Sequence, residues 1–201
     1  MSLKYYKCCI VKFRYYRFRA RAIEMAFDLK KYHETCYHGT NRSAAKDILK
    51  TNSFLESKGK EHWLGEGIYF FEKDVGQARD FISKARKTRD YSIIEAEISS
   101  EKLLDLVDKD TFEELNDLCE EMIARLKKIS GNGKAIKIKN LMTNTIALNA
   151  AYDVMPYEVV RAAFETPKVE KIRGTNFIPV QIQVCVKEPK AIVRIEEMSS
   201  A

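Results

Sequence analysis

Long apolar runs are absent from this sequence of 201 residues. None approaches the roughly 18 residues that a membrane-spanning helix needs, so we expect no contact with a membrane. Proline is scarce, at four residues, and 32% of the chain is charged against 45% hydrophobic. This balance argues against disorder and supplies enough apolar side chains for a core. The length fits one domain, or one domain with an extension.

Histidine and cysteine are too few and too scattered for a metal centre. The chain has three histidines and five cysteines, an odd number with no spacing typical of a zinc site or a disulfide framework. We therefore expect no bound metal and a reducing, cytoplasmic environment. Cys36 and Cys185 fall within apolar segments, where a cysteine usually acts as a small hydrophobic side chain.

Excess positive charge is confined to the first 24 residues, where seven lysines and arginines face one glutamate, whereas residues 25–201 are neutral overall. Aromatic side chains are interleaved with these bases, a pattern typical of single-stranded nucleic-acid binding. Three interpretations of residues 1–24 stay open: a dispensable extension or misassigned start, a nucleic-acid-binding arm, and an added structural strand.

The chain also lacks the glycine-rich motifs of dinucleotide-binding and P-loop folds. Its hydrophobic periodicity predicts an α+β fold. We expect strands at 67–71, 91–98, 178–186 and 191–196, and helices at 41–51, 74–86, 111–130, 141–152 and 157–164. Asn41 is the expected N-cap of the first helix, and Thr111 with Glu114 forms a capping box for the long one. Residues 25–201 form the predicted domain, with a helical insertion at about 101–172.

Two short segments carry the strongest functional signal. They are Tyr37-His38-Gly39-Thr40 and, about thirty residues later, Trp63-Leu64-Gly65-Glu66-Gly67-Ile68-Tyr69-Phe70-Phe71. We interpret the first as a His-Gly turn that leaves a short strand, and the second as a glycine-flanked strand with an outward tyrosine. The Gly39 backbone can approach a flat amide, the His38 imidazole can hold a sugar hydroxyl, and the Tyr69 ring can stack on a nicotinamide. The spacing predicts a grip for a nicotinamide nucleotide.

A third segment, the strand expected at 178–186, places Gln181 and Gln183 on the face opposite its apolar side chains. A buried amide without a partner costs about 1–3 kcal/mol. The two glutamines therefore need either a ligand or neighbouring backbone and water, and both interpretations stay open.

Together these segments resemble the ADP-ribosyltransferase superfamily, in the branch shared by diphtheria-type toxins and poly(ADP-ribose) polymerases. That branch carries His, Tyr and Glu (sometimes Gln) on three separate strands, and His38, Tyr69 and Gln183 match these positions. The resemblance covers roughly residues 35–85 and 157–197. It implies an ADP-ribosyltransferase-like split antiparallel β-sheet with surrounding helices around an NAD cleft.

The resemblance also implies roles for the three matched residues. His38 would anchor a ribose, Tyr69 would stack on nicotinamide, and Gln183 would hold the nicotinamide ribose. Glutamine keeps the hydrogen bond of the usual glutamate but lacks its charge and cannot act as a base. Elongation of poly(ADP-ribose) is then not expected, whereas cleavage of NAD or transfer of one ADP-ribose is.

Four further residues are candidate NAD contacts: Gly39, Thr40, Ser43 and Arg161. Gly39 would present its backbone to the carboxamide. Thr40 and Ser43 would bind ribose or phosphates, although either can instead cap the following helix, which we favour for Ser43. Arg161, on the helix predicted at 157–164, would neutralise the pyrophosphate or else lie in solvent.

The resemblance thus predicts a cytoplasmic mono-ADP-ribosyltransferase or NAD-cleaving enzyme of microbial type. Its substrate would be NAD, and its acceptor a protein, a nucleic acid or a small molecule. A toxin role with a partner antitoxin follows from the family alone. Two alternatives stay open: a catalytically silent module that binds NAD or ADP-ribose, and a nucleic-acid-binding protein that acts through residues 1–24.

Overall fold

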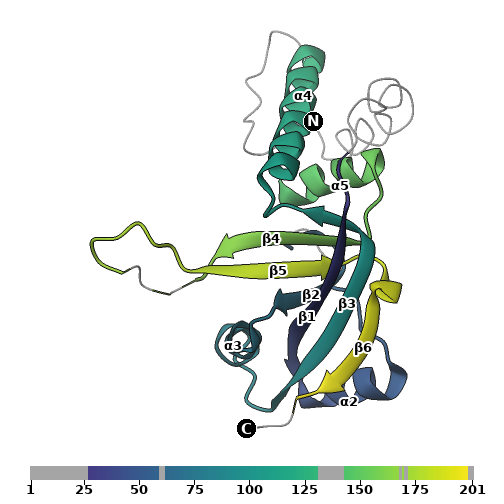
Figure 1. Ribbon diagram of the computed structural model, residues 1–201, viewed down its shortest axis with the longest axis vertical. Coiled ribbons are helices and arrows are strands. Elements are labelled where there is room, and N and C mark those ends of the chain that lie inside the picture. Colours follow the sequence, from purple (N-terminus) through teal and green to yellow (C-terminus); the bar gives the residue numbers. More distant parts are fainter. Residues whose placement is uncertain (1–26, 59–61, 131–142, 168, 170–171, 199–201) are drawn as a thin grey trace.

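The computed structural model describes residues 27–58, 62–130, 143–167, 169 and 172–198 (Figure 1). The predicted N-terminal extension, residues 1–24, lies outside these described residues. Within them the fold is α+β, as the sequence predicts, with a six-stranded sheet and four α-helices.

Five of the six strands close into a barrel. Its members, in spatial order, are β1 (Lys30–Asn41), β2 (Ile68–Glu72), β5 (Val180–Val186), β4 (Val159–Glu165) and β3 (Tyr91–Asp105), and β3 pairs with β1 to complete the ring. The sixth strand, β6 (Ile192–Glu197), pairs with the first half of β3, whereas β4 pairs with its last three residues. The β3–β4 pair is parallel, so the expectation of an entirely antiparallel sheet is wrong at this position.

Four α-helices pack around the barrel: α2 (Arg42–Thr51), α3 (Val75–Asp80), α4 (Lys109–Ser130) and α5 (Asn144–Val154). Helix α3 continues as the π-helical turn η2 (Phe81–Ala85), and a short 3-10 turn, η4 (Pro189–Ala191), precedes β6. The Asn41 side chain accepts a hydrogen bond from Ala44 N–H at 2.8 Å, which confirms the predicted N-cap of α2. At α4 the predicted capping box is wrong. Asp108 Oδ1 accepts from the Thr111 N–H at 3.0 Å, so the helix begins three residues earlier than a Thr111 cap requires.

The segment predicted as a helix at 157–164 is instead strand β4. Val159 and Val160 are β-branched and fully buried, and all seven residues of the strand pair with β5. Its apolar positions fit a helical or a strand period over so short a length. Pairing with β5 on one edge and with β3 on the other makes this segment a strand. The predicted helical insertion at 101–172 therefore contains the end of β3 and the whole of β4, both of which belong to the barrel.

The barrel interior is one apolar cluster to which all five ring strands contribute. Its members include Ile68, Phe70, Ile94, Ile98, Val159, Val184 and Val186. Side chains of α2 and the following Phe54 belong to the same cluster. Two further apolar clusters lie outside the barrel, one beneath α4 and α5 and the other beneath α3. The wall formed by β2 and β5 therefore has a core on its inner side and two separate clusters on its outer side.

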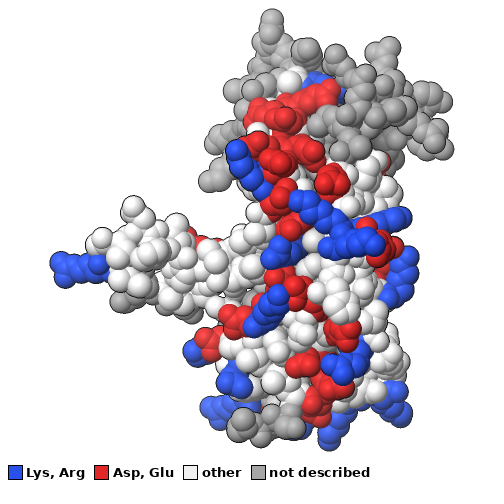
Figure 2. Space-filling model, in the orientation of Figure 1, with Lys and Arg blue, Asp and Glu red and all other residues white. Residues whose placement is uncertain are grey.

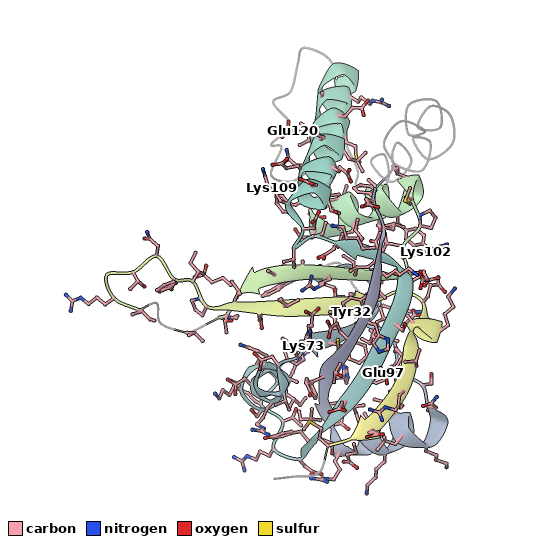
Figure 3. All side chains as sticks on the ribbon, viewed as in Figure 1. Tyr32, Lys73, Glu97, Lys102, Lys109 and Glu120 are labelled. Carbon is pink, nitrogen blue, oxygen red and sulfur yellow. The ribbon has the colours of Figure 1, made fainter. Side chains whose placement is uncertain are left out.

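The connection between β4 and β5 projects from the barrel as an arm (Figure 1). Its described residues expose apolar side chains: Val169, Ile172, Phe177 and Ile178. The arm is mostly uncharged in Figure 2, whereas acidic side chains gather on α4, which Lys109 and Glu120 mark in Figure 3. No helix in the described ranges is both long and apolar enough to cross a membrane.

Candidate active site

The predicted ribose anchor, His38, lies within a strand of twelve residues and not at a turn. The strand continues past it because β1 pairs with β3 as far as Asn41. The His38 ring packs against Phe54 and Phe70, with centroid distances of 5.2 and 5.7 Å. Both phenylalanines belong to the barrel core, so the His38 side chain lies on the inner side of the barrel wall.

The His38 imidazole is held in one tautomer. Its Nδ1 lies 2.7 Å from the carbonyl oxygen of Tyr69, and because a carbonyl only accepts, Nδ1 carries the proton and donates. Burial lowers the pKa of His38 from its ordinary value of 6.5. The ring is therefore mainly neutral at pH 7, and Nε2 is left as a hydrogen-bond acceptor.

Gly39 brings the backbone of β1 against helix α3. A Cβ atom at this position would lie 2.4 Å from the Ala78 carbonyl oxygen and 3.1 Å from the Ile82 side chain. Carbon atoms do not approach backbone so closely, so this packing requires glycine for its lack of a side chain.

The backbone polar groups of Gly39 face β2. The Lys73 N–H donates to the Thr35 carbonyl at 3.0 Å, and alternate residues of an antiparallel strand direct their N–H and C=O groups to the same edge. Gly39 lies one such step beyond the last β1–β2 register pair, Tyr37–Phe71. Its N–H and C=O are therefore placed at the point where the regular ladder ends.

Tyr69 fixes the turn that precedes β2. Its hydroxyl accepts from the Leu64 N–H at 2.9 Å and donates to the Gly65 carbonyl at 2.6 Å. Burial is the main cause that raises the pKa of Tyr69 above its ordinary value of 10, so the phenol stays neutral. The ring lies 5.6 Å from the His62 ring and is half-buried, which leaves part of its surface available to a ligand.

Gln183 shares the outer face of the barrel wall with Tyr69. On the paired strands β2 and β5, Tyr69 lies opposite Cys185 and Phe71 lies opposite Gln183. Alternate side chains of a strand point to the same face. We call the outer face of the β2–β5 pair, which carries Tyr69, Gln183 and the buried Phe71, the Tyr69 face. His38 lies on the inner side, so the predicted triad is divided between the two sides of the wall and joined by the His38–Tyr69 backbone hydrogen bond.

Aromatic side chains flank the Tyr69 face on two sides. The Trp63 ring lies 4.8 Å from Phe164 of β4, and the Phe81 ring of η2 lies 5.9 Å from Phe71. Trp63 is 42% exposed and Phe81 is 38% exposed. Each ring is therefore partly exposed, and the Arg86 guanidinium lies over the Phe81 ring at 5.3 Å from its centroid.

Thr40 and Ser43 lie on either side of the β1–α2 junction. Thr40 is half-buried and pairs with Ser92 of β3, whereas Ser43 is exposed in the first turn of α2. Asn41 caps this helix, so the capping role favoured for Ser43 is wrong. Neither hydroxyl forms the cap.

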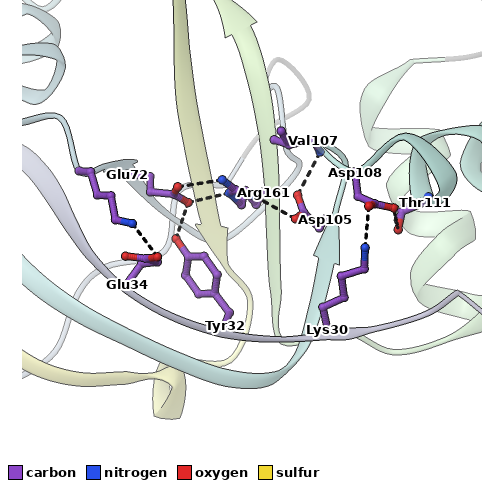
Figure 4. Close-up of polar contacts among 10 residues, drawn as sticks. Lys30, Tyr32, Glu34, Glu72, Asp105, Val107, Asp108, Thr111 and Arg161 are labelled. Carbon is purple, nitrogen blue, oxygen red and sulfur yellow. Dashed lines mark hydrogen bonds and ion pairs between the residues drawn. The ribbon is translucent and has the colours of Figure 1, made fainter.

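Arg161 is engaged in a network of ion pairs inside the barrel end (Figure 4). Its Nε and Nη2 donate to the two carboxylate oxygens of Glu72 at 2.7 and 2.9 Å, and its Nη1 donates to Asp105 at 2.9 Å. The Tyr32 hydroxyl donates to the same Glu72 carboxylate at 2.8 Å. A pyrophosphate would have to displace two carboxylates to reach this guanidinium. The structure therefore separates Arg161 from the Tyr69 face.

A polar hollow of about 310 Å³ lies beside this network and is lined by β1 together with Glu72, Asp105 and Arg161. Its charged groups are already paired, including Lys30 with Asp108 at 2.7 Å. Sequence reasoning missed this cluster. The only signal for this cluster in the sequence is the charge of Glu72 at the end of an apolar segment. The sequence does not indicate that its partner is Arg161, which lies 89 positions later.

Among the described residues, no group of three histidine, cysteine or acidic side chains is placed to hold a metal ion. Cys36 and Cys185 are buried free thiols, as expected for small hydrophobic side chains. Burial raises the pKa of Cys36 to about 12 and that of Cys185 to about 11. Neither thiol is prepared to act as a nucleophile near pH 7.

Comparison with known proteins places the chain beside an archaeal sequence. A protein of Methanocaldococcus jannaschii, "Uncharacterized protein MJ0359", is 32% identical over 190 aligned residues, which cover 81% of this chain and 86% of that protein. No family model matches the chain, and no solved structure gives a significant match.

Proposed function

The chain belongs to the same family as this archaeal protein, and we propose that it is an NAD-dependent ADP-ribosyltransferase, which splits the nicotinamide–ribose bond. One observation carries the proposal. A neutral His38 imidazole donates to the Tyr69 carbonyl at the end of the β1–β2 ladder, beside the backbone of Gly39. The backbone that would bind an amide and the ring that would stack on it thus lie at one strand crossing, where His38 holds the Tyr69 carbonyl from the inner side of the wall.

Nicotinamide would be recognised by the β1 backbone and by Tyr69. A carboxamide has a donor and an acceptor, and the Gly39 C=O and N–H supply the complementary pair on the edge that faces β2. The half-buried Tyr69 ring would stack on the pyridinium, and a cation over such a ring gains about 0.5–2 kcal/mol. The stacking contact would select the oxidised, charged form of the cofactor ring, because the carboxamide is the same in both forms.

The nicotinamide ribose would be held by Gln183, whose amide offers a hydrogen bond on the Tyr69 face. His38 lies on the inner side of the wall, so it would act by fixing the Tyr69 carbonyl through its Nδ1–H and not by contact with the same ribose. As the bond to C1′ breaks, its electron pair leaves with nicotinamide and positive charge develops on the ribose. A nucleophile then bonds to C1′ and releases its proton to solvent, because Gln183 cannot accept it.

The rate should depend on orientation more than on charge. A glutamate at position 183 would place a negative charge beside the developing cation, a contribution of roughly 3–4 kcal/mol in comparable electrostatic sites. Gln183 supplies positioning alone, which still contributes several kcal/mol. Water as the nucleophile would yield ADP-ribose, and another acceptor would carry a single ADP-ribose.

Two observations favour a second candidate, a silent module that binds NAD or ADP-ribose without cleaving it. Gln183 provides no charge, and Arg161 is sequestered by Glu72 and Asp105. Such a module would use the same Tyr69 face. It differs only in leaving bound NAD intact.

Nicotinamide release from NAD by the purified protein tests the proposal, with His38→Ala and Tyr69→Ala measured alongside. The proposal expects release that both variants reduce at least 100-fold while circular dichroism shows a retained fold. Binding of NAD without release, weakened in both variants, would support the silent module. If the protein neither releases nicotinamide nor binds NAD, both candidate functions are refuted.

A further inference from the structure

Three consecutive carbonyl groups, those of Leu64, Gly65 and Glu66, converge on two side chains. The Lys187 ammonium lies 2.8 Å from the Leu64 oxygen and also donates to the Glu66 oxygen. The Tyr69 hydroxyl donates to the Gly65 oxygen between them. The turn that precedes β2 thus receives side-chain hydrogen bonds from one lysine and one tyrosine, in addition to the backbone pair between Ser57 and Gly67.

This turn lies flush against the end of β5. Gly67 has a φ of +147°, and a Cβ atom there would lie 2.6 Å from both the Cys185 sulfur and the Val186 carbonyl oxygen. Gly65 has a φ of +75°, and a Cβ atom there would approach the Lys187 ammonium to 3.1 Å. Gly65 is therefore favoured by its conformation, and Gly67 by its conformation and by close packing.

The turn also carries Trp63, the single tryptophan of the chain. Its carbonyl accepts a hydrogen bond from the Asn144 side chain at 3.0 Å, and its ring contacts Phe164. The position of the turn therefore determines where the Tyr69 hydroxyl is held and where the Trp63 ring lies beside the Tyr69 face.

We propose that Lys187 is a positioning residue for the nicotinamide site: it holds the turn of residues 64–66, which in turn orients Tyr69 and Trp63. The assignment of these two rings to nicotinamide rests on the proposed function. An ammonium has three donors, and two of them bind the Leu64 and Glu66 carbonyls, the second of which also accepts from the Cys185 thiol at 3.6 Å. Without the ammonium the turn opens, and the Tyr69 hydroxyl loses the fixed geometry of its two hydrogen bonds.

The lysine backbone is anchored independently of its side chain. The Lys187 N–H donates to the Glu158 carbonyl at 2.8 Å, so a substitution leaves the chain path of β5 in place. A matched control lies three residues later: the Lys190 ammonium pairs with the Glu158 carboxylate at 2.7 Å, on an exposed side chain away from the turn.

Fluorescence of Trp63 tests the proposal without requiring any NAD chemistry. In Lys187→Met we expect the acrylamide quenching constant of Trp63 to rise at least twofold, whereas Lys190→Met matches the wild type. Lys187→Arg, which retains cationic donors, should restore at least half of the difference. Unchanged quenching in Lys187→Met would overturn the proposal.

Steady-state nicotinamide release then tests the positioning role. Lys187→Met should raise KM for NAD at least tenfold and lower kcat less than threefold, because the lysine does not contact the reacting atoms. Equal kinetics in Lys187→Met and wild type, despite altered quenching, would overturn that role. If the wild type releases no nicotinamide, the proposed function fails, and the fluorescence result alone decides whether Lys187 holds the turn.

Discussion

The Nδ1–H of His38 reaches the carbonyl oxygen of Tyr69 at 2.7 Å, one step after the last backbone pair between β1 and β2. Where the backbone pairing of β1 and β2 ends, a hydrogen bond from the His38 side chain therefore continues the contact between the two strands. This contact fixes the imidazole tautomer and keeps the polar edge of Gly39 beside β2. The candidate site thus depends on how strand pairing ends, in addition to which residues are present.

The protonation of His38 should make the stability of the fold depend on pH. Because burial lowers its folded-state pKa below 6.5, the unfolded chain binds more protons than the folded chain as the pH falls through that value. The free energy of unfolding should therefore fall below pH 6.5, by at most about 1.4 kcal/mol per pH unit. Urea unfolding of wild type and His38→Gln between about pH 5 and 8 measures this contribution.

His38→Gln should show a smaller fall in stability on the acid side and an unchanged slope above about pH 7.5, where the ring is neutral in both states. Identical pH dependence in the two proteins across the whole range would contradict a buried, neutral His38.

A methyl group at Gly39 should destabilise the fold. Gly39→Ala places a carbon 2.4 Å from the Ala78 carbonyl, so helix α3 must move, at a cost of about 1–3 kcal/mol. Gly76→Ala is the comparison, since its nearest neighbour is the Asp74 side chain that caps α3, at 3.2 Å and so less crowded than the 2.4 Å contact at Gly39, and alanine favours a helix. Chemical denaturation compares the two. Equal stability would show that α3 does not press on β1.

Removal of Arg161 should be among the most damaging single changes. The Glu72 side chain is 6% exposed, and Arg161→Met would leave its carboxylate buried without its ionic partner, which typically costs about 3–5 kcal/mol. Arg194→Met removes an arginine whose side chain is 57% exposed and should cost less than about 1 kcal/mol. Thermal unfolding distinguishes these outcomes.

A second change identifies the cause of that damage. Arg161→Met combined with Glu72→Gln should recover part of the lost stability, because no uncompensated charge then remains. A double variant that is as unstable as the sum of the two single variants would argue that the network contributes only through packing.

Local sequence signals predicted much of the fold. Asn41 capped its helix as expected, the strand that carries Tyr69 appeared within one residue of its predicted bounds, and the last two strands were placed correctly. These elements have caps or alternation that neighbouring residues determine. The prediction of a helix around Arg161 was wrong because the few apolar residues of this segment fit a helical period and a strand period equally well. Only the pairing with β5 shows that it is a strand.

The arrangement of the site was beyond the sequence for a similar reason. The sequence placed His38 and Tyr69 on nearby strands, but it did not show that their side chains lie on opposite sides of the barrel wall. That depends on the register between β1 and β2, which barrel closure sets. Arg161 was likewise a candidate for pyrophosphate only until Glu72 and Asp105 were found beside it.

The most direct test of the account is a gain of activity at Gln183. Gln183→Glu restores a negative charge on the Tyr69 face, beside the position proposed for the nicotinamide ribose. If that placement is right, the variant should release nicotinamide from NAD at least tenfold faster than wild type, as transition-state electrostatics of more than about 1.4 kcal/mol would require. Release by Gln183→Glu no faster than by wild type, with the fold and NAD binding retained, would contradict the assignment of this face to NAD cleavage.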